Sequence, residues 1–328
     1  MAVGSLFMPD APDSDVTRIN PTAVLQSTNH LLDDPEGLAK FYEENGYLLL
    51  RNVLERESIA QARREMFAVM ERHGLIGPGA TEPVWTGKPF AGGLEESDEF
   101  AGISRRLLEH PDNAVVMAKI LGEPACTVPI VQYRTYPPGS PQSSIHQDGF
   151  YSPGIQDYRP VWITLTDCPR QFGGLAIAVG QNRRGYMHNL AKAPASPIPE
   201  GVIPDETWAT TDYQPGDVLV IHPYAPHASL PNRTNLCRVT FDTRVQSAAY
   251  PRVIAGTVAD FTADSITMQT RDGLSRKFRV DNETFIRIIT PHQRIPYAEY
   301  VETVKQGMNL VVAFDGDHAE MLRKAAEG

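Results

Sequence analysis

The chain has 328 residues, 41% hydrophobic and 21% charged, so it can bury a sizeable core and has an ordinary globular composition. Its formal net charge of −10 argues against nucleic acid or an anionic membrane as the main partner. The first residues lack a basic region followed by an apolar run, and no stretch approaches the roughly 18 apolar residues that span a bilayer. We therefore expect no secretory signal, no membrane partner and a cytoplasmic location.

The first third of the chain is predicted to be helical. Residues 1–30 are rich in Pro, Ser, Asp and Asn without periodicity, and we expect an extended arm there. Residues 34–36 then supply an acidic N-cap, a proline at the first helical position and an acid in the first turn, which predicts a helix that ends at Gly46. The next expected elements are a buried strand over 47–50 and helices over about 55–73 and 104–121.

From residue 127 the pattern changes to short apolar runs separated by proline and glycine. The runs cover 128–136, 161–166, 174–179, 218–221 and 238–244. Many short strands with turn signals between them are typical of an all-β barrel or sandwich. The preceding helices would pack on the outside of this β core.

The last part of the chain has a different residue pattern. The expected elements are strands over 253–258, 265–270, 277–280, 284–289 and 310–314, a hairpin turn at 271–273 and a helix over 297–305. We therefore expect three parts: an extended arm over 1–30, a main domain over 31–248 and a small β-rich C-terminal domain over 249–328. The last part could serve oligomerisation or partner binding, or form a lid over a pocket.

The three cysteines, Cys126, Cys168 and Cys237, are an odd number at wide spacing. They fit neither a disulfide framework nor a cysteine-based zinc site. Cys126 and Cys237 have apolar neighbours, so we interpret them as buried thiols rather than nucleophiles.

The tripeptide His146-Gln147-Asp148 carries the strongest chemical signal. Alternate side chains of a β-strand share a face, so His146 and Asp148 can both point inward while Gln147 points outward. A third ligand from a distant strand would complete the two-histidine, one-carboxylate facial triad, which leaves positions open on a ferrous ion. Taken alone, this tripeptide occurs often by chance, and its histidine and aspartate usually have only a structural role.

His227 is the best candidate for the third ligand. It follows the buried strand 218–221, and Arg238 opens the next strand in apolar surroundings, where a guanidinium needs a partner such as a carboxylate. The polar turn between them brings His227 and Arg238 to the same end of adjacent strands. His222 lies five residues before His227 and is the competing candidate, but the spacing to Arg238 favours His227.

With these residues in place, positions 35–246 resemble the phytanoyl-CoA dioxygenase family of iron(II)- and 2-oxoglutarate-dependent oxygenases. The most specific parts are the Tyr-x-x-x-Pro-Pro-Gly to His-Gln-Asp stretch ending at Asp148, and the pairing of His227 with Arg238 eleven residues later. The resemblance implies a mainly β fold with flanking helices, built on a double-stranded β-helix (jelly roll, cupin-like) core. It also implies that His146, Asp148 and His227 bind Fe(II).

The resemblance further implies which residues hold the cosubstrates 2-oxoglutarate and O2. Arg238 matches the arginine that grips the distal carboxylate of 2-oxoglutarate, and Ser229 matches the hydroxyl that assists it. Gln132 and Trp162 match residues that contact the cosubstrate. Phe150 and Tyr151 follow the metal motif and are interpreted either as lining of the substrate pocket or as core aromatics.

The resemblance implies an enzyme that oxidises, in the first instance by hydroxylation, a C–H bond of a small organic substrate in natural-product biosynthesis, with release of succinate and CO2. The carboxylate at Asp148 disfavours halogenation. Desaturation, epoxidation, rearrangement and acyl-CoA hydroxylation stay open, although no basic cluster marks a CoA site. From other classes, a zinc hydrolase is an alternative, against which Arg238 and Ser229 argue. A non-catalytic β-barrel binding module is another, against which the three ligands together with Arg238 argue. A homo-oligomer could form through the C-terminal segment.

Overall fold

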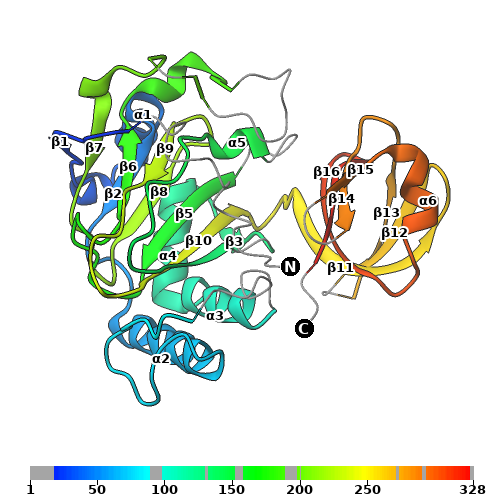
Figure 1. Ribbon diagram of the computed structural model, residues 1–328. Helices are drawn as coiled ribbons and strands as arrows, with labels where there is room; N and C mark the ends of the chain where they lie inside the picture. Colours follow the sequence, from blue (N-terminus) through cyan, green and yellow to red (C-terminus); the bar gives the residue numbers. More distant parts are fainter. Residues whose placement is uncertain are drawn as a thin grey trace.

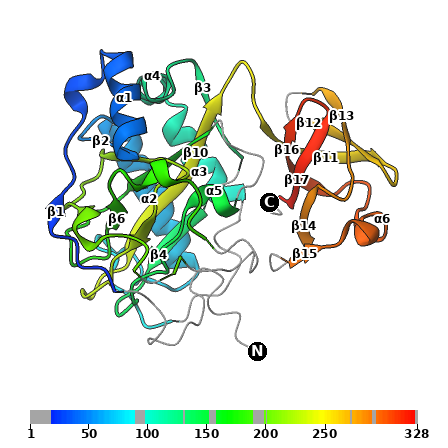
Figure 2. The same ribbon diagram turned by 90° about the horizontal axis from the view of Figure 1, so that it is seen from above.

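The computed structural model describes residues 18–88, 98–129, 132–151, 158–188, 198–199, 201–270, 273–289 and 293–325. Within these ranges two facing β-sheets carry helices along one side, and a smaller β-barrel follows them (Figure 1, Figure 2). No helix in these ranges is long and apolar enough to cross a bilayer.

The main part of the molecule contains a six-stranded antiparallel sheet and a four-stranded sheet. The larger sheet has the order β2 (Tyr47–Leu50), β8 (Val218–Ile221), β5 (Tyr158–Thr164), β10 (Arg238–Ser247) and β3 (Ala125–Thr127), with β4 (Gln132–Tyr136) also paired to β10. The smaller sheet has the order β1 (Ala23–Val24), β7 (Trp208–Thr210), β6 (Leu175–Ala178) and β9 (His227–Ser229). This arrangement is the predicted jelly-roll core, so the predicted fold class is confirmed.

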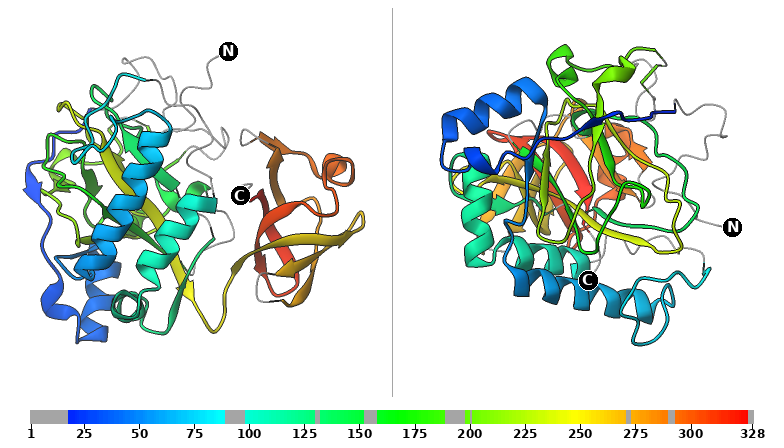
Figure 3. Two further views of the ribbon diagram at one scale, coloured as in Figure 1. Left: turned by 90° about the horizontal axis from the view of Figure 1, so that it is seen from below. Right: turned by 90° about the vertical axis from the view of Figure 1, so that its left-hand side faces the viewer.

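The larger sheet is buried on both faces, and side chains alternate between these two faces along each strand. In β2, Leu48 and Leu50 pack beneath the helices, whereas Tyr47 and Leu49 pack between the two sheets. The helices that cover the outer face are α1 (Pro35–Asn45), α2 (Arg56–Arg72), α3 (Asp98–Leu108) and α4 (Pro111–Leu121) (Figure 3). Shorter helical turns are η1 (Asn29–Leu31), α5 (Asp148–Tyr151), η3 (Gln181–Arg184) and η5 (Asp205–Thr207).

The caps of α1 agree with the prediction. The Asp34 side chain accepts a hydrogen bond from the Gly37 amide at 3.0 Å, and Gly46 ends the helix with φ +80°. The single helix expected over 104–121 is wrong, because the chain breaks into α3 and α4 there. Pro111 starts α4 and forces the preceding residue, His110, into an extended conformation.

The C-terminal strands pair with one another within the described residues. They are β11 (Val253–Phe261), β12 (Ser265–Thr270), β13 (Ser275–Arg279), β14 (Phe285–Ile289), β15 (Gln293–Ile295), β16 (Asn309–Asp315) and β17 (His318–Lys324). Because β13 also pairs with β17, the sheet closes into a barrel. The helix expected over 297–305 is shorter, with η6 (Tyr297–Glu299) followed by α6 (Tyr300–Thr303). Residues 271 and 272 of the expected hairpin turn lie outside the described residues.

The barrel packs against the larger sheet through buried apolar side chains. One cluster contains Val128 and Tyr158 from the main part and Val311, Ala313 and Met321 from the barrel. The Gln246 side chain at the end of β10 hydrogen-bonds to the backbone of residues 252 and 253. These contacts fix where β11 leaves the main part.

Candidate active site

Two histidines from separate segments lie side by side at one end of the smaller sheet. His146 and His227 exchange two backbone hydrogen bonds, at 3.1 and 2.9 Å, in an antiparallel bridge. Their rings therefore stand next to each other, with centroids 4.2 Å apart. The pairing depends on β9, which places His227 at its first position.

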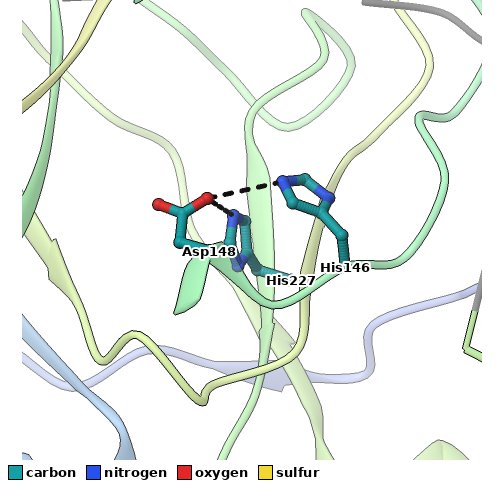
Figure 4. Close-up of side chains that lie close together, drawn as sticks. All are labelled: His146, Asp148 and His227. Carbon is teal, nitrogen blue, oxygen red and sulfur yellow. Dashed lines mark ion pairs between the residues drawn. The ribbon is translucent and has the colours of Figure 1, made fainter. Parts of the chain in front are cut away.

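Asp148 completes the group from the first turn of α5 (Figure 4). Its Oδ1 atom lies 3.8 Å from Nε2 of His146 and 3.8 Å from Nε2 of His227. One possible ligand atom from each residue lies within 4.8 Å of the others, and the carboxylate is buried. These three side chains can hold one divalent metal ion on a single face.

The expectation that His146 and Asp148 project from one regular strand is wrong. His146 forms an isolated bridge, and the chain enters α5 at Asp148. Gln147, expected to point outward, is fully buried and donates hydrogen bonds to the carbonyls of Gly185 and Tyr224. The side chain of Gln147 therefore fixes the turn between the two ligands by hydrogen bonds to backbone groups distant in sequence.

The ring orientation of both histidines is set by backbone carbonyls. Nδ1 of His146 lies 3.0 Å from the Ser144 carbonyl oxygen, and Nδ1 of His227 lies 3.0 Å from the Ala225 carbonyl oxygen. A carbonyl can only accept, so each Nδ1 carries the proton and donates. Both Nε2 atoms are then left with a lone pair directed at the site, which is the tautomer that a metal requires.

His222, the competing histidine, lies outside this group. Its Nε2 atom is 3.5 Å from the Glu43 carboxylate, its Nδ1 accepts the Tyr224 amide, and its ring packs near Tyr42. Burial lowers the pKa of His222 more than the nearby Glu43 raises it. These contacts indicate a packing role for His222, and the structure groups His227 with His146 and Asp148.

Arg238 is fully buried at the start of β10. Its Nη1 atom donates to Ser229 Oγ at 3.0 Å and to the Gly173 carbonyl, so the two residues expected to share the cosubstrate are in contact. The guanidinium lies 4.5 Å from the ring centre of Tyr136 and 5.8 Å from that of Trp162. The sequence reasoning missed Tyr136, although its register opposite Arg238 on β4 follows from the strand pairing.

The structure describes the side chain of Trp162 but not that of Gln132. Trp162 is buried, and its Nε1 atom has no hydrogen-bond partner among the described residues, so an oxygen of a bound ligand would satisfy it. Gln132 starts β4, and Phe150 and Tyr151 lie in α5, but their side chains lie outside the described part of the structure.

A second buried arginine, Arg244, was missed by the sequence reasoning. Its Nη2 atom lies 3.4 Å from Oδ2 of Asp148. The spacing in the sequence could have indicated Arg244, because Arg238 and Arg244 are six residues apart on one strand and so project from the same face.

The cysteines show no nucleophilic character. Cys168 and Cys237 are buried, and burial raises the pKa of each thiol to about 12. Cys126 is half-buried, and burial again raises its pKa. Thiol chemistry at neutral pH therefore has no support in these three residues.

The similarities to known proteins agree with this geometry. The model of the phytanoyl-CoA dioxygenase (PhyH) family matches residues 42–240, more than half of the chain. The chain belongs to this family. The 1-deoxypentalenic acid 11-beta-hydroxylases of Streptomyces exfoliatus and Streptomyces arenae are each 34% identical, over 68% of this chain and 84% of theirs. The epimerase SnoN, solved with Fe3+, alpha-ketoglutarate and nogalamycin RO, has a TM-score of 0.52 at 16% identity, over 88% of this chain and 98% of that one, and shares the fold.

Membership of the PhyH family makes the chain an iron- and 2-oxoglutarate-dependent oxygenase. The residues present fit both groups. Two imidazoles and one carboxylate are a ligand set that suits ferrous iron and leaves coordination positions open. The buried guanidinium of Arg238 suits a carboxylate of 2-oxoglutarate.

Proposed function

We propose that this oxygenase hydroxylates an unactivated C–H bond of a small natural-product intermediate, with His146, Asp148 and His227 as iron ligands. The observation that carries the proposal is the convergence of their three ligand atoms within 4.8 Å, next to buried Arg238. The two Streptomyces relatives are named as hydroxylases of 1-deoxypentalenic acid, which supports a substrate of this size and class.

The protein's own contribution is to hold and orient the reactants. Iron and 2-oxoglutarate, when bound with O2, supply the oxidation, with succinate and CO2 as products. Arg238 and Ser229 would bind the distal carboxylate of 2-oxoglutarate, and a charge-assisted pair at a buried position is both strong and directional. The carbonyls of Ser144 and Ala225 keep both imidazoles in the metal-binding tautomer throughout.

We also propose that the chain divides near residue 248 into an oxygenase domain, 31–248, and a C-terminal domain, 249–328. In support, the strands from 253 to 324 pair with one another in the described ranges and surround their own apolar cluster. Association of two chains through the C-terminal domain stays a prediction, which light scattering of the purified protein would check.

The first experiment tests whether Arg238 binds 2-oxoglutarate, an interaction called the clamp below. Anaerobic protein with Fe(II) and 2-oxoglutarate should develop the weak visible charge-transfer band of a 2-oxo acid chelated to iron. We expect Arg238→Ala to raise the 2-oxoglutarate concentration needed for half of this band by about 10- to 100-fold, because a charged hydrogen-bond partner is lost. Arg51→Ala is the matched control, since Arg51 pairs with Asp217 at 2.6 Å instead of the metal ligands.

Two outcomes would contradict the proposal. A band that forms in Arg238→Ala at the wild-type 2-oxoglutarate concentration rejects the clamp. Unchanged Fe(II) binding in Asp148→Ala rejects the ligand set. The substrate itself is identified by screening small metabolites for coupled succinate release, and a CoA thioester as the only active class would reject the natural-product assignment.

A further inference from the structure

Arg244 contacts a different oxygen of Asp148 from the one that lies near the two histidines. Oδ1 of Asp148 faces Nε2 of both histidines, whereas Oδ2 faces Nη2 of Arg244 at 3.4 Å. The carboxylate thus has one oxygen directed at the metal position and the other directed at a cation. Arg244 lies outside the part of the chain that matches the PhyH model, which ends at residue 240.

The guanidinium of Arg244 stays charged although it is 6% exposed. Burial alone would lower its pKa, but the nearby charges of Asp148 and Asp242 and the Tyr158 side chain outweigh this and raise the pKa above its ordinary value. A buried cation of this kind is stable only when an anion lies beside it. Oδ2 of Asp148 lies 3.4 Å from Nη2 of Arg244.

The C-terminal barrel covers this arginine indirectly. The Tyr158 ring lies 5.8 Å from the Arg244 guanidinium, and Tyr158 is buried in the cluster that contains Val311 and Met321 of the barrel. Barrel, Tyr158, Arg244 and Asp148 thus form one continuous series of packed side chains. Arg244 and Asp148 are each 6% exposed, and low exposure strengthens the attraction between opposite charges.

We propose that Arg244 is a positioning residue that holds Oδ2 of Asp148, so that the carboxylate presents Oδ1 alone to the metal. The inference rests on the proposed function, because it assumes the ligand set His146, Asp148 and His227. A carboxylate can bind a metal through one oxygen or through both. Binding through both would occupy a coordination position that 2-oxoglutarate or O2 needs, and Arg244 prevents this.

The test is a titration that measures Co(II) binding to the full-length metal-free protein. We expect Arg244→Met to weaken Co(II) binding by about 10- to 100-fold, the usual effect of removing a residue that supports a metal ligand. Arg244→Lys, which keeps the charge without the planar fork, should recover part of the affinity. Arg51→Met is the control: it removes another arginine–carboxylate pair and should leave Co(II) affinity within about two-fold of wild type.

A second readout separates positioning from general destabilisation. In Arg244→Met saturated with Fe(II), the anaerobic 2-oxoglutarate charge-transfer band should shift in wavelength, because the carboxylate changes its binding mode. A variant that was merely less stable would keep the wild-type band. Circular dichroism checks folding, and Arg244→Gln, expected to lose Co(II) affinity by about 10-fold or more, carries the test if the methionine variant does not fold.

The failure of this inference is distinguishable from the failure of the proposed function. Co(II) affinity within about two-fold of wild type in Arg244→Met, with an unshifted band, overturns the role of Arg244. If Asp148→Ala has meanwhile lost Co(II) binding, the ligand set stands. If Asp148→Ala also binds Co(II) normally, the ligand set is wrong and the inference falls with it.

Discussion

Two buried arginines on one strand meet different chemical groups. Arg238 contacts the Ser229 hydroxyl, the Gly173 carbonyl and the rings of Tyr136 and Trp162. Arg244 instead faces the carboxylate of Asp148. A guanidinium beside a carboxylate is suited to hold that carboxylate in place, and we propose that the guanidinium of Arg238 binds the carboxylate of 2-oxoglutarate.

A histidine of the barrel predicts a pH dependence of stability. His318 lies 3.1 Å from Asp281 and 3.0 Å from Glu320. Burial by itself lowers the pKa of His318, but the hydrogen bonds to Glu320 and Asp281 outweigh it and raise the pKa above 6.5. The raised value stabilises the fold fully below the unfolded-state pKa, and this stabilisation is lost as the pH rises through the folded-state pKa.

We therefore expect the melting temperature of the wild-type protein to fall as the pH rises from about 6.5 through the folded-state pKa of His318, and the fall to be smaller in His318→Gln. Thermal unfolding followed by circular dichroism across this window measures both. His30→Gln, at an exposed position in η1, is the control and should follow the wild-type curve. Identical slopes for His318→Gln and the wild type would reject the ion-pair contribution.

Among the elements, the corner between α1 and β2 ties the helical layer to the sheets. Gly46 ends α1 in the left-handed region, and its carbonyl accepts the His222 amide at 2.9 Å. A Cβ atom at this position would lie 2.8 Å from Oδ1 of Asn182 and 3.2 Å from Cβ of Ala225. Both the backbone angle and the close packing therefore require glycine.

Gly122 allows the effect of the backbone angle to be measured without the effect of close packing. It ends α4 with φ +85°, and a Cβ there would meet nothing within 4 Å. We expect Gly122→Ala to lower the free energy of unfolding by about 1 kcal/mol, the cost of a left-handed alanine. Gly46→Ala should cost about 1–3 kcal/mol more, because the buried Asn182 must also move. Urea unfolding of both variants measures the difference, and equal losses would mean that the packing around Gly46 adapts freely.

For the whole molecule, the interface between the barrel and the larger sheet joins the C-terminal strands to the proposed metal site. The barrel contributes Val311, Ala313 and Met321 to the cluster that contains Tyr158. Tyr158 in turn lies over Arg244, which contacts Asp148. We therefore expect barrel residues in this cluster to influence metal affinity.

Met321→Glu tests this connection. Met321 is 3% exposed, and a buried charge there should lower the free energy of unfolding by about 3 kcal/mol or more. Co(II) affinity should fall as well, because water reaches Tyr158 and Arg244. Val301→Glu, at a barrel position that is 43% exposed, is the control and should change neither quantity. Loss of stability in Met321→Glu with unchanged Co(II) affinity would reject the coupling.

Much of the fold was predictable from local patterns. The runs 218–221 and 265–270 became β8 and β12 with the predicted bounds, because short apolar or β-branched segments between turn residues have few alternatives. β17 was not predicted, since His318–Lys324 is rich in helix-forming residues, and pairing with β16 on one side and β14 on the other overrides that preference.

By itself, the sequence determined which chemical groups are present and in what order: two imidazoles, one carboxylate and a later arginine are enough to predict iron and 2-oxoglutarate. Only the tertiary structure decided how they meet. Asp148 reaches the proposed metal position from α5, Gln147 is buried, and Arg244 contacts Oδ2 of Asp148. The reason is that strand alternation is local, whereas these three placements depend on hydrogen bonds and packing between segments far apart in the chain.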